Sequence, residues 1–239
     1  MRDGSSMSKS SQNGPIGLYS PLLERAGFRH AFFTNSLDFA VSTGEALARA
    51  AGVLGVLPER VYFLSQVHGT AARVLAGEER REEVVRSIGD ITLTITKGVA
   101  AGVRTADCVP VLVADRTSSA VAAIHSGWRG TVANVVHAGI AALRELTGGS
   151  GDWCAAVGPH IQRCCFEVGA DVAAELERAS TAGEAAVIRG ERLRVDLRRI
   201  VRAQLEAEGV SREAIDDAVV RFSASLEPDE RNVSGGVFN

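Results

Sequence analysis

The segment VPVLVADRTSSAVAAIHSGWRG, residues 109–130, contains two apolar runs joined by a short polar link. The runs cover 109–115 and 119–125, have the length of strands and are rich in valine, alanine and isoleucine. The link between them is short enough to close an antiparallel hairpin. The second run ends on His125, and a turn bracketed by two glycines follows it. The segment therefore predicts a buried hairpin with a histidine at the end of its second strand.

The expected register of this hairpin pairs Ala114 with Ser119, so that Cys108 faces His125. Directly opposed residues of an antiparallel pair share one face, and their Cβ atoms lie about 4.5–5.5 Å apart. A slip of one residue would send the two side chains to opposite faces. In the expected register, a thiol and an imidazole converge on one point.

Two chemistries suit a converging cysteine and histidine. His125 could act as the base for a nucleophilic Cys108 thiolate, or both could ligate a metal. The stretch LSQVHGT supplies a further ligand, because His68 also ends an apolar run and precedes a glycine. Two histidines and one cysteine match a catalytic zinc site whose fourth position stays open. The three residues are dispersed along the chain, so a core thiol and two strand-end histidines remain the alternative.

Composition narrows the class of protein. The 239 residues are 46% hydrophobic and 23% charged, which suits a globular chain with a sizeable core. A formal net charge of -3 does not indicate the basic surface that a nucleic-acid-binding protein needs. No apolar run approaches the roughly 20 residues that span a bilayer, and the first residues do not resemble a signal peptide. We expect a cytoplasmic monomer or homodimer without nucleic-acid or membrane partners.

The cysteines indicate reduced thiols. Of the four, Cys108, Cys154, Cys164 and Cys165, the last two are adjacent, which suits no ordinary disulfide framework. We expect Cys164 and Cys165 to be inert.

The remaining elements predict an α+β fold with a mixed sheet. Residues 1–14 are rich in serine and glycine and predict a disordered lead-in to one domain over 15–239. The apolar patterns predict strands at 28–34, 60–67 and 90–96 (the last half-buried), helices at 42–55 (stopped by Pro58), 131–146, 169–179 and 196–209, and a hairpin at 186–196 turning at Gly190. Strands and helices interleave without a regular βαβ period, which favours α+β over a doubly wound sheet.

Four motifs together carry a family resemblance: SQVHGT (65–70), TADCVPVL (105–112), HSGWRGTVANVV (125–136) and VGPHIQRCCFEVG (157–169). In order and spacing they resemble the bacterial laccase-domain family, variously labelled polyphenol oxidase, purine nucleoside phosphorylase or peptidoglycan editing factor. The resemblance runs from about Leu18 to Val220. It implies a single-domain α/β/β/α four-layer sandwich and a zinc ion bound by His68, Cys108 and His125, which are then also the catalytic residues.

The activity implied by the resemblance is zinc-dependent phosphorolysis of adenosine, inosine and methylthioadenosine, together with deamination of adenosine. Purine nucleosides and phosphate are then the partners. A metal that acidifies water suits attack on C6 of the purine. The family labels also leave three alternatives: an amide hydrolase that edits cell-wall precursors, a copper-dependent polyphenol oxidase, and a non-catalytic metal-binding homologue.

Residues beside the three candidate ligands have structural as well as functional interpretations. For Asp107 a structural hydrogen bond is favoured over catalysis, and for Trp128 packing is favoured over stacking on a purine. Arg104 and Arg129 are each either phosphate ligands or ordinary surface residues. His160 is expected to shape a loop or line a pocket without binding the metal.

Two departures from the family pattern concern phosphorolysis. The stretch FFTNSLDFA has Asn35 where the family carries a basic, glycine-rich loop, and the arginine of that loop has no counterpart. Near the C-terminus, Phe222 stands where the family has a cysteine, and a pair of arginines is missing. If the missing arginine helps to bind phosphate, phosphorolysis is impaired while the metal site survives.

Overall fold

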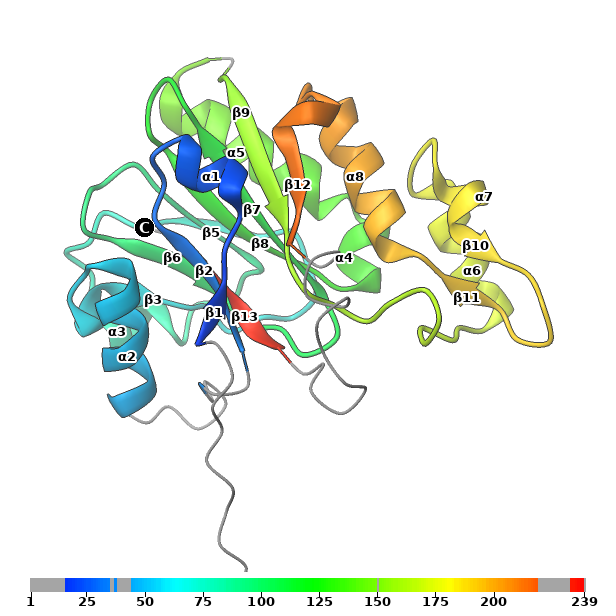
Figure 1. Ribbon diagram of the computed structural model, residues 1–239, viewed down its shortest axis with the longest axis horizontal. Coiled ribbons are helices and arrows are strands. Elements are labelled where there is room, and N and C mark those ends of the chain that lie inside the picture. The colour runs from blue at the N-terminus through cyan, green and yellow to red at the C-terminus, as the bar shows by residue number, and fades with distance from the viewer. Residues whose placement is uncertain (1–15, 35–36, 38–43, 150, 219–232, 239) are drawn as a thin grey trace, which may run out of the picture.

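The structure is a computed structural model that describes residues 16–34, 37, 44–149, 151–218 and 233–238 (Figure 1). The expected lead-in at 1–14 and the departures at Asn35 and Phe222 lie outside these residues. The strands are β1 Gly17–Leu18, β2 His30–Thr34, β3 Val61–Tyr62, β4 Ala72–Val74, β5 Ile91–Thr94, β6 Ala100–Val103, β7 Val109–Asp115, β8 Val121–Ser126, β9 Trp153–Val157, β10 Val187–Ile188, β11 Arg194–Val195, β12 Ile215–Asp217 and β13 Val233–Phe238. The α-helices are α1 Pro21–Arg25, α2 Gly44–Leu54, α3 Arg81–Val84, α4 Trp128–Val132, α5 Val135–Thr147, α6 Ala170–Arg178, α7 Gly183–Ala186 and α8 Leu197–Ala207, and short 3-10 turns cover Pro58–Arg60 and Arg212–Ala214.

Two mixed sheets form the centre of the fold. One has the strand order β1-β2-β13-β6-β3 and the other β12-β9-β7-β8-β5-β4, while β10 and β11 form a separate hairpin. The sheets face each other, because β6 contacts both β5 and β8. The outer face of the five-stranded sheet is covered by α2, and α5 packs on β8 with α8 beside it (Figure 1). The predicted single-domain α+β sandwich is therefore confirmed.

Alternation along β2 shows how this sandwich follows from the sequence. Ala31 and Phe33 are fully buried in the cluster that includes α2. Phe32, between them, is fully buried in the larger cluster with the six-stranded sheet. Successive residues of a strand point to opposite faces, so a fully apolar strand requires cover on both sides. In the part of the chain that the structure describes, no helix combines the length and apolarity needed to cross a membrane.

The hairpin of β7 and β8 forms as predicted, but two residues away from the expected register. Pro110 pairs with His125 and Val109 with Ser126, so Cys108 is not directly opposite His125. A shift by an even number of residues keeps each side chain on its face. Cys108 therefore becomes a diagonal neighbour of His125, still within reach on the same face.

Asp115 explains the register. Its carboxylate accepts the backbone N–H groups of Thr117 and Ser118 and that of Asp152, on the neighbouring connection. Ser119 has a left-handed backbone, with φ +65°, and donates its N–H to the Asp115 carbonyl. The turn thus takes four residues, Arg116 to Ser119, where the sequence suggested three.

Several other predicted elements need correction. The strand predicted at 60–67 is short, with β3 covering only Val61–Tyr62. The strand at 90–96 is not half-buried: every residue of β5 is buried, because the second sheet covers the threonine face. There Thr92 donates a hydrogen bond to the Gly102 carbonyl and Thr94 to that of Leu75.

Helix boundaries differ in two places. The helix at 131–146 is interrupted at Asn134, whose φ of +56° ends α4 and whose side chain caps α5 by accepting the His137 N–H. The helix at 42–55 ends at Gly55, which has a left-handed backbone, rather than at Pro58. The helices at 169–179 and 196–209 and the hairpin at 186–196 are confirmed.

Replacing Asp115 with alanine tests the turn. Three N–H groups lose their charged acceptor, so we expect Asp115→Ala to lower the free energy of unfolding by about 2–3 kcal/mol at pH 7, measured by urea denaturation.

Burial raises the pKa of Asp115, but the hydrogen bonds from Ser118, Thr117 and Asp152 outweigh it and lower the pKa overall. The stabilisation is therefore complete above about pH 4 and is lost as the pH falls through the folded-state pKa. The gap between wild type and variant should close over that range, whereas Glu175→Ala, at an exposed position in the middle of α6, should show neither effect. A gap that does not change with pH contradicts this account of the turn.

Candidate metal centre

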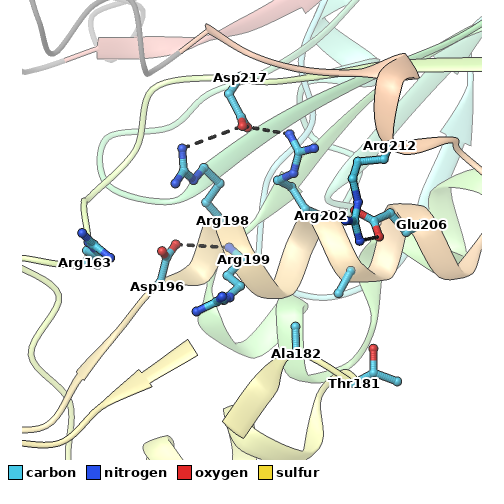
Figure 2. Close-up of a pocket in the computed structure, with 11 residues that line it drawn as sticks. Arg163, Thr181, Ala182, Asp196, Arg198, Arg199, Arg202, Glu206, Arg212 and Asp217 are labelled. Carbon is cyan, nitrogen blue, oxygen red and sulfur yellow. Dashed lines mark hydrogen bonds and ion pairs between the residues drawn. The ribbon is translucent and has the colours of Figure 1, made fainter. Parts of the chain in front are cut away.

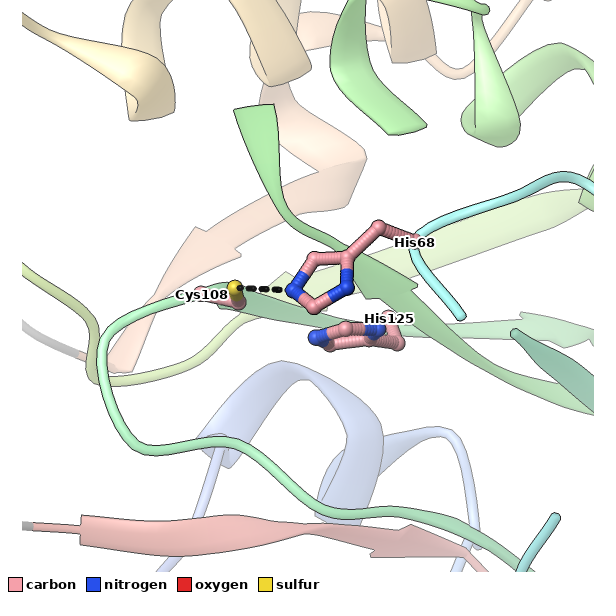
Figure 3. A group of neighbouring side chains, drawn as sticks. All are labelled: His68, Cys108 and His125. Atoms are coloured by element: carbon pink, nitrogen blue, oxygen red, sulfur yellow. Dashed lines mark hydrogen bonds between the residues drawn. The ribbon is translucent and has the colours of Figure 1, made fainter. Parts of the chain in front are cut away.

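Three separate segments bring His68, Cys108 and His125 together at one end of the six-stranded sheet (Figure 3). His68 lies in the loop between β3 and β4, Cys108 directly precedes β7, and His125 is near the end of β8. One potential ligand atom from each residue lies within 4.8 Å of the other two. Cys108 Sγ is 3.7 Å from His68 Nε2, and the two imidazole centroids are 4.9 Å apart. His125 is buried, Cys108 is half-buried and His68 is exposed, so the group opens to solvent on the His68 side.

Asp90 orients His125. Its carboxylate is fully buried, and its Oδ1 lies 2.7 Å from Nδ1 of His125. A neutral imidazole that donates Nδ1–H to a carboxylate leaves its Nε2 lone pair free. Carboxylate–histidine pairs of this kind fix the tautomer of metal-binding histidines in many proteins. His125 is thus presented as a ligand through Nε2.

The same carboxylate holds the loop that carries His68. Asp90 accepts the N–H groups of His68 and Gly69 at 2.9 and 2.7 Å, and that of Val67 at 3.3 Å. His68 has a φ of +62°, a left-handed conformation that costs a non-glycine residue roughly 1–2 kcal/mol. Hydrogen bonds to a charged acceptor contribute about 1.5–3 kcal/mol each, which offsets this strain. The strained backbone is therefore maintained by Asp90 and directs the imidazole toward Cys108.

Gly127 makes room for the group. A Cβ atom at this position would overlap the His68 ring and would lie 2.9 Å from Cys108 Sγ. The turn expected after His125 is in fact the start of α4, for which Gly127 is the N-cap. The glycine is required by close approach, since any side chain would push His68 and Cys108 apart.

The protonation states distinguish the two chemistries left open by the sequence. Burial raises the pKa of the Cys108 thiol to about 11, and the nearby negative charges of Asp107 and Asp90 contribute. Burial lowers the pKa of His125, although Asp90 partly opposes the change. At neutral pH, Cys108 is then a protonated thiol unless a cation lies beside it. This disfavours a free thiolate nucleophile and favours a thiolate that forms on metal binding.

The donor set fits zinc. Bond lengths of about 2.3 Å to sulfur and 2.05 Å to nitrogen, at a tetrahedral angle, place the two atoms about 3.6 Å apart. The 3.7 Å between Cys108 Sγ and His68 Nε2 matches this separation. Three protein ligands leave a fourth position free, as in catalytic zinc sites. Within the described residues this is the one group of at least three potential ligands, and it could hold a metal ion.

Trp128 and Arg104 make structural contacts beside the group of three. Trp128 packs partly buried against the main core, as expected, and the Arg129 guanidinium lies 4.3 Å from the centre of its ring. Arg104 donates from its guanidinium to the Leu64 carbonyl. Asp107 is exposed, and its side chain makes no hydrogen bond within the described part of the chain, so the expected structural bond is not seen there.

His160 and the other cysteines lie outside the group of three. Nδ1 of His160 is 2.7 Å from the Gly158 carbonyl, and burial lowers the pKa of this imidazole, consistent with a role in shaping its loop. Cys154 is buried in the core, while Cys164 and Cys165 are exposed with their Sγ atoms 2.7 Å apart.

Asp90 and Gly127 are the site residues that sequence reasoning missed. A signal for Asp90 was present, since GDITLTIT places a single carboxylate directly before a strand that is apolar on one face. A buried charge at such a position needs several partners. Gly127 had no signal beyond its place between His125 and Trp128.

Together, the fold and the site define an α+β sandwich protein with a candidate single-metal centre of two histidines and one cysteine. The chain belongs to the family described as multi-copper polyphenol oxidoreductase laccase, which matches residues 34–226.

Curated relatives and a solved structure agree with this assignment. A Streptomyces coelicolor protein named purine nucleoside phosphorylase SCO2081 is 38% identical over 73% of this chain and 71% of its own length. A Deinococcus radiodurans protein named purine nucleoside phosphorylase is 37% identical over 70% of this chain, which spans 63% of that relative. A protein of an unknown prokaryotic organism, named adenosine deaminase RL5, is 32% identical over 72% of this chain and 69% of its own length. The crystal structure of the Bacillus licheniformis hypothetical protein YfiH matches 82% of this chain and 79% of its own with a TM-score of 0.70, which at 21% identity supports the fold.

Replacing Gly127 with alanine tests the close packing of the group. The added Cβ forces His68 and Cys108 apart, so we expect zinc affinity to fall by at least about tenfold while the fold is kept. Competition with a chromogenic chelator measures the affinity. Gly52→Ala is the matched control, because no atom lies within 4 Å of a Cβ built at this exposed helical glycine. Equal zinc affinity in Gly127→Ala and wild type would contradict the packing argument.

Proposed function

We propose that this protein is a zinc-dependent purine nucleoside phosphorylase that also deaminates adenosine, with adenosine, inosine and methylthioadenosine as substrates. The observation that carries the proposal is the open group of His68, Cys108 and His125. The names of the relatives support the substrate class, because they include purine nucleoside phosphorylases and one adenosine deaminase. The proposal treats residues 15–239 as one catalytic domain.

In this proposal His68, Cys108 and His125 hold the metal and act as the catalytic residues. Bound zinc supplies Lewis acidity, which lowers the pKa of water or polarises an oxygen of the substrate. The protein residues set the geometry: Asp90 keeps Nε2 of His125 unprotonated, and the left-handed backbone at His68 directs its ring. The exposed side of His68 is the route by which a nucleoside reaches the group.

Copper is the second candidate metal, and the family description favours it. The described residues, however, hold one group of three ligands rather than several, which fits a single ion better than a multi-copper centre. The amide-hydrolase alternative with Cys108 as nucleophile is disfavoured by the raised pKa of its thiol. A non-catalytic homologue is an outcome of the experiments below.

The first experiment measures the metal. We expect the purified protein to hold about one zinc ion per chain by elemental analysis, and His125→Ala to lose it while still unfolding cooperatively in urea. His137→Ala is the matched control, because His137 is an exposed histidine on α5 that contacts Glu208, outside the group of three. Copper in place of zinc, or zinc retained by His125→Ala, would refute the proposed centre.

The second experiment measures the reaction. Adenosine incubated with the protein, with and without phosphate, is followed by chromatography for adenine, inosine and hypoxanthine. We expect inosine in both conditions and free base only with phosphate, with phosphorolysis the weaker activity because the family loop arginine has no counterpart at Asn35. His137→Ala should keep both activities and His125→Ala should lose them. A zinc-loaded protein that converts no purine nucleoside would rule out this function.

A further inference from the structure

A polar pocket lies at the same end of the six-stranded sheet as the candidate metal centre, because Asp217 ends β12 and Arg163 follows β9. It has a volume of about 540 Å³ and lies against α8, with β12 at its upper edge in Figure 2. β9 and β7 separate β12 from β8, which at the usual strand spacing places the β12 edge of this pocket roughly 14 Å across the sheet from the strand that carries His125. The two sites are therefore distinct.

Charged side chains line this pocket. They are five arginines and three carboxylates: Arg163, Arg198, Arg199, Arg202, Arg212, Asp196, Glu206 and Asp217. Glu206 is held by Arg212, with oxygen–nitrogen distances of 3.0 and 3.3 Å. The pocket therefore carries two more positive than negative formal charges.

The excess charge resides on Arg163 and Arg199. Neither side chain forms an ion pair with the described residues: the Arg199 guanidinium donates only to the Ala185 carbonyl, and Arg163 is exposed. Arg202 and Arg198 share one oxygen of Asp217, at 2.8 and 3.7 Å. The other oxygen of Asp217 is buried, so this carboxylate offers the pocket only an oxygen that is already neutralised. Figure 2 shows Arg163, Arg198 and Arg199 around Asp196.

Two of the arginines on α8 stand where the helix dipole disfavours positive charge. Arg198 and Arg199 occupy the first turn of the helix, where the backbone dipole is positive and basic residues are unfavourable by about 0.3–1 kcal/mol. The first turn contains no acidic residue, and only the capping Asp196 opposes the charge. Residues whose positions oppose a local preference are found at functional sites.

We propose that this pocket binds a small molecule carrying a phosphate monoester, such as a sugar phosphate. A monoester carries a charge of about -1.5 to -2 near neutral pH, which matches the excess of two. Unpaired guanidinium groups bind phosphate oxygens bidentately. The pocket is much larger than a phosphate ion and falls within the usual range of small-molecule sites, so it leaves room for the organic part of the ligand.

Isothermal titration with ribose 5-phosphate, inorganic phosphate and ribose tests the site on the intact protein. We expect ribose 5-phosphate to bind, inorganic phosphate to bind more weakly, ribose not to bind, and added sodium chloride to weaken binding. The double variant Arg163→Gln, Arg199→Gln should weaken ribose 5-phosphate binding by at least about tenfold. The matched double variant Arg80→Gln, Arg86→Gln removes two exposed arginines at α3 and should bind like wild type.

Three results would overturn the proposal. They are no binding of ribose 5-phosphate at about 1 mM, equal binding by the Arg163, Arg199 double variant, and inorganic phosphate binding that is lost in this double variant yet is as tight as that of the ester. Binding should persist in His125→Ala, because the pocket does not include the metal ligands. The experiment measures binding rather than turnover. The pocket proposal can therefore be refuted while the proposed enzyme activity is confirmed, and the enzyme activity can be refuted while the pocket proposal is confirmed.

Discussion

The buried carboxylate of Asp90 is the constraint on which the candidate metal centre depends. It joins three segments: the start of β5, the loop at 67–69 and the end of β8. The Asp90 carbonyl also accepts the N–H of His125. Asp90 and His125 are therefore joined both through their backbones and through their side chains. One residue thereby sets the tautomer of His125 and the backbone of His68. Without it, the loop would lose the acceptor that offsets its left-handed conformation.

Charge balance explains why a carboxylate is tolerated at this depth. An isolated buried charge is costly, but Asp90 accepts four hydrogen bonds from neighbouring N–H groups. A divalent cation bound by the Cys108 thiolate and two neutral histidines would leave one positive charge, and Asp90 would offset it. The raised pKa of Cys108 belongs to the same balance, since Asp90 contributes to it when no cation is near. Asp90, Cys108 and the metal are thus best understood as one electrostatic unit.

The sequence predicts the parts of this structure that depend on local patterns. The β7–β8 hairpin, the mixed α+β class and the shared face of Cys108 and His125 follow from apolar runs and turn chemistry. The register of the hairpin does not follow from these patterns, because it depends on a four-residue turn that is held by hydrogen bonds to the Asp115 carboxylate. The burial of Thr92 does not either, because it requires a second sheet assembled from distant segments. Asp90 was missed since its partners lie 21 to 35 residues away.

The connection after β9 links the metal centre to the arginine pocket physically. Gly158 donates its N–H to Pro110, and a Cβ at Gly158 would lie 2.8 Å from the proline ring, so this connection is closely packed on β7. Ile161 then donates to the carbonyl of Asp107, next to Cys108. Arg163, at the pocket, follows two residues later. One wall of the pocket and the backbone beside Cys108 therefore belong to the same short hydrogen-bonded segment. Separate binding sites on one packed segment are coupled whenever binding shifts that segment, and the coupling acts equally in both directions.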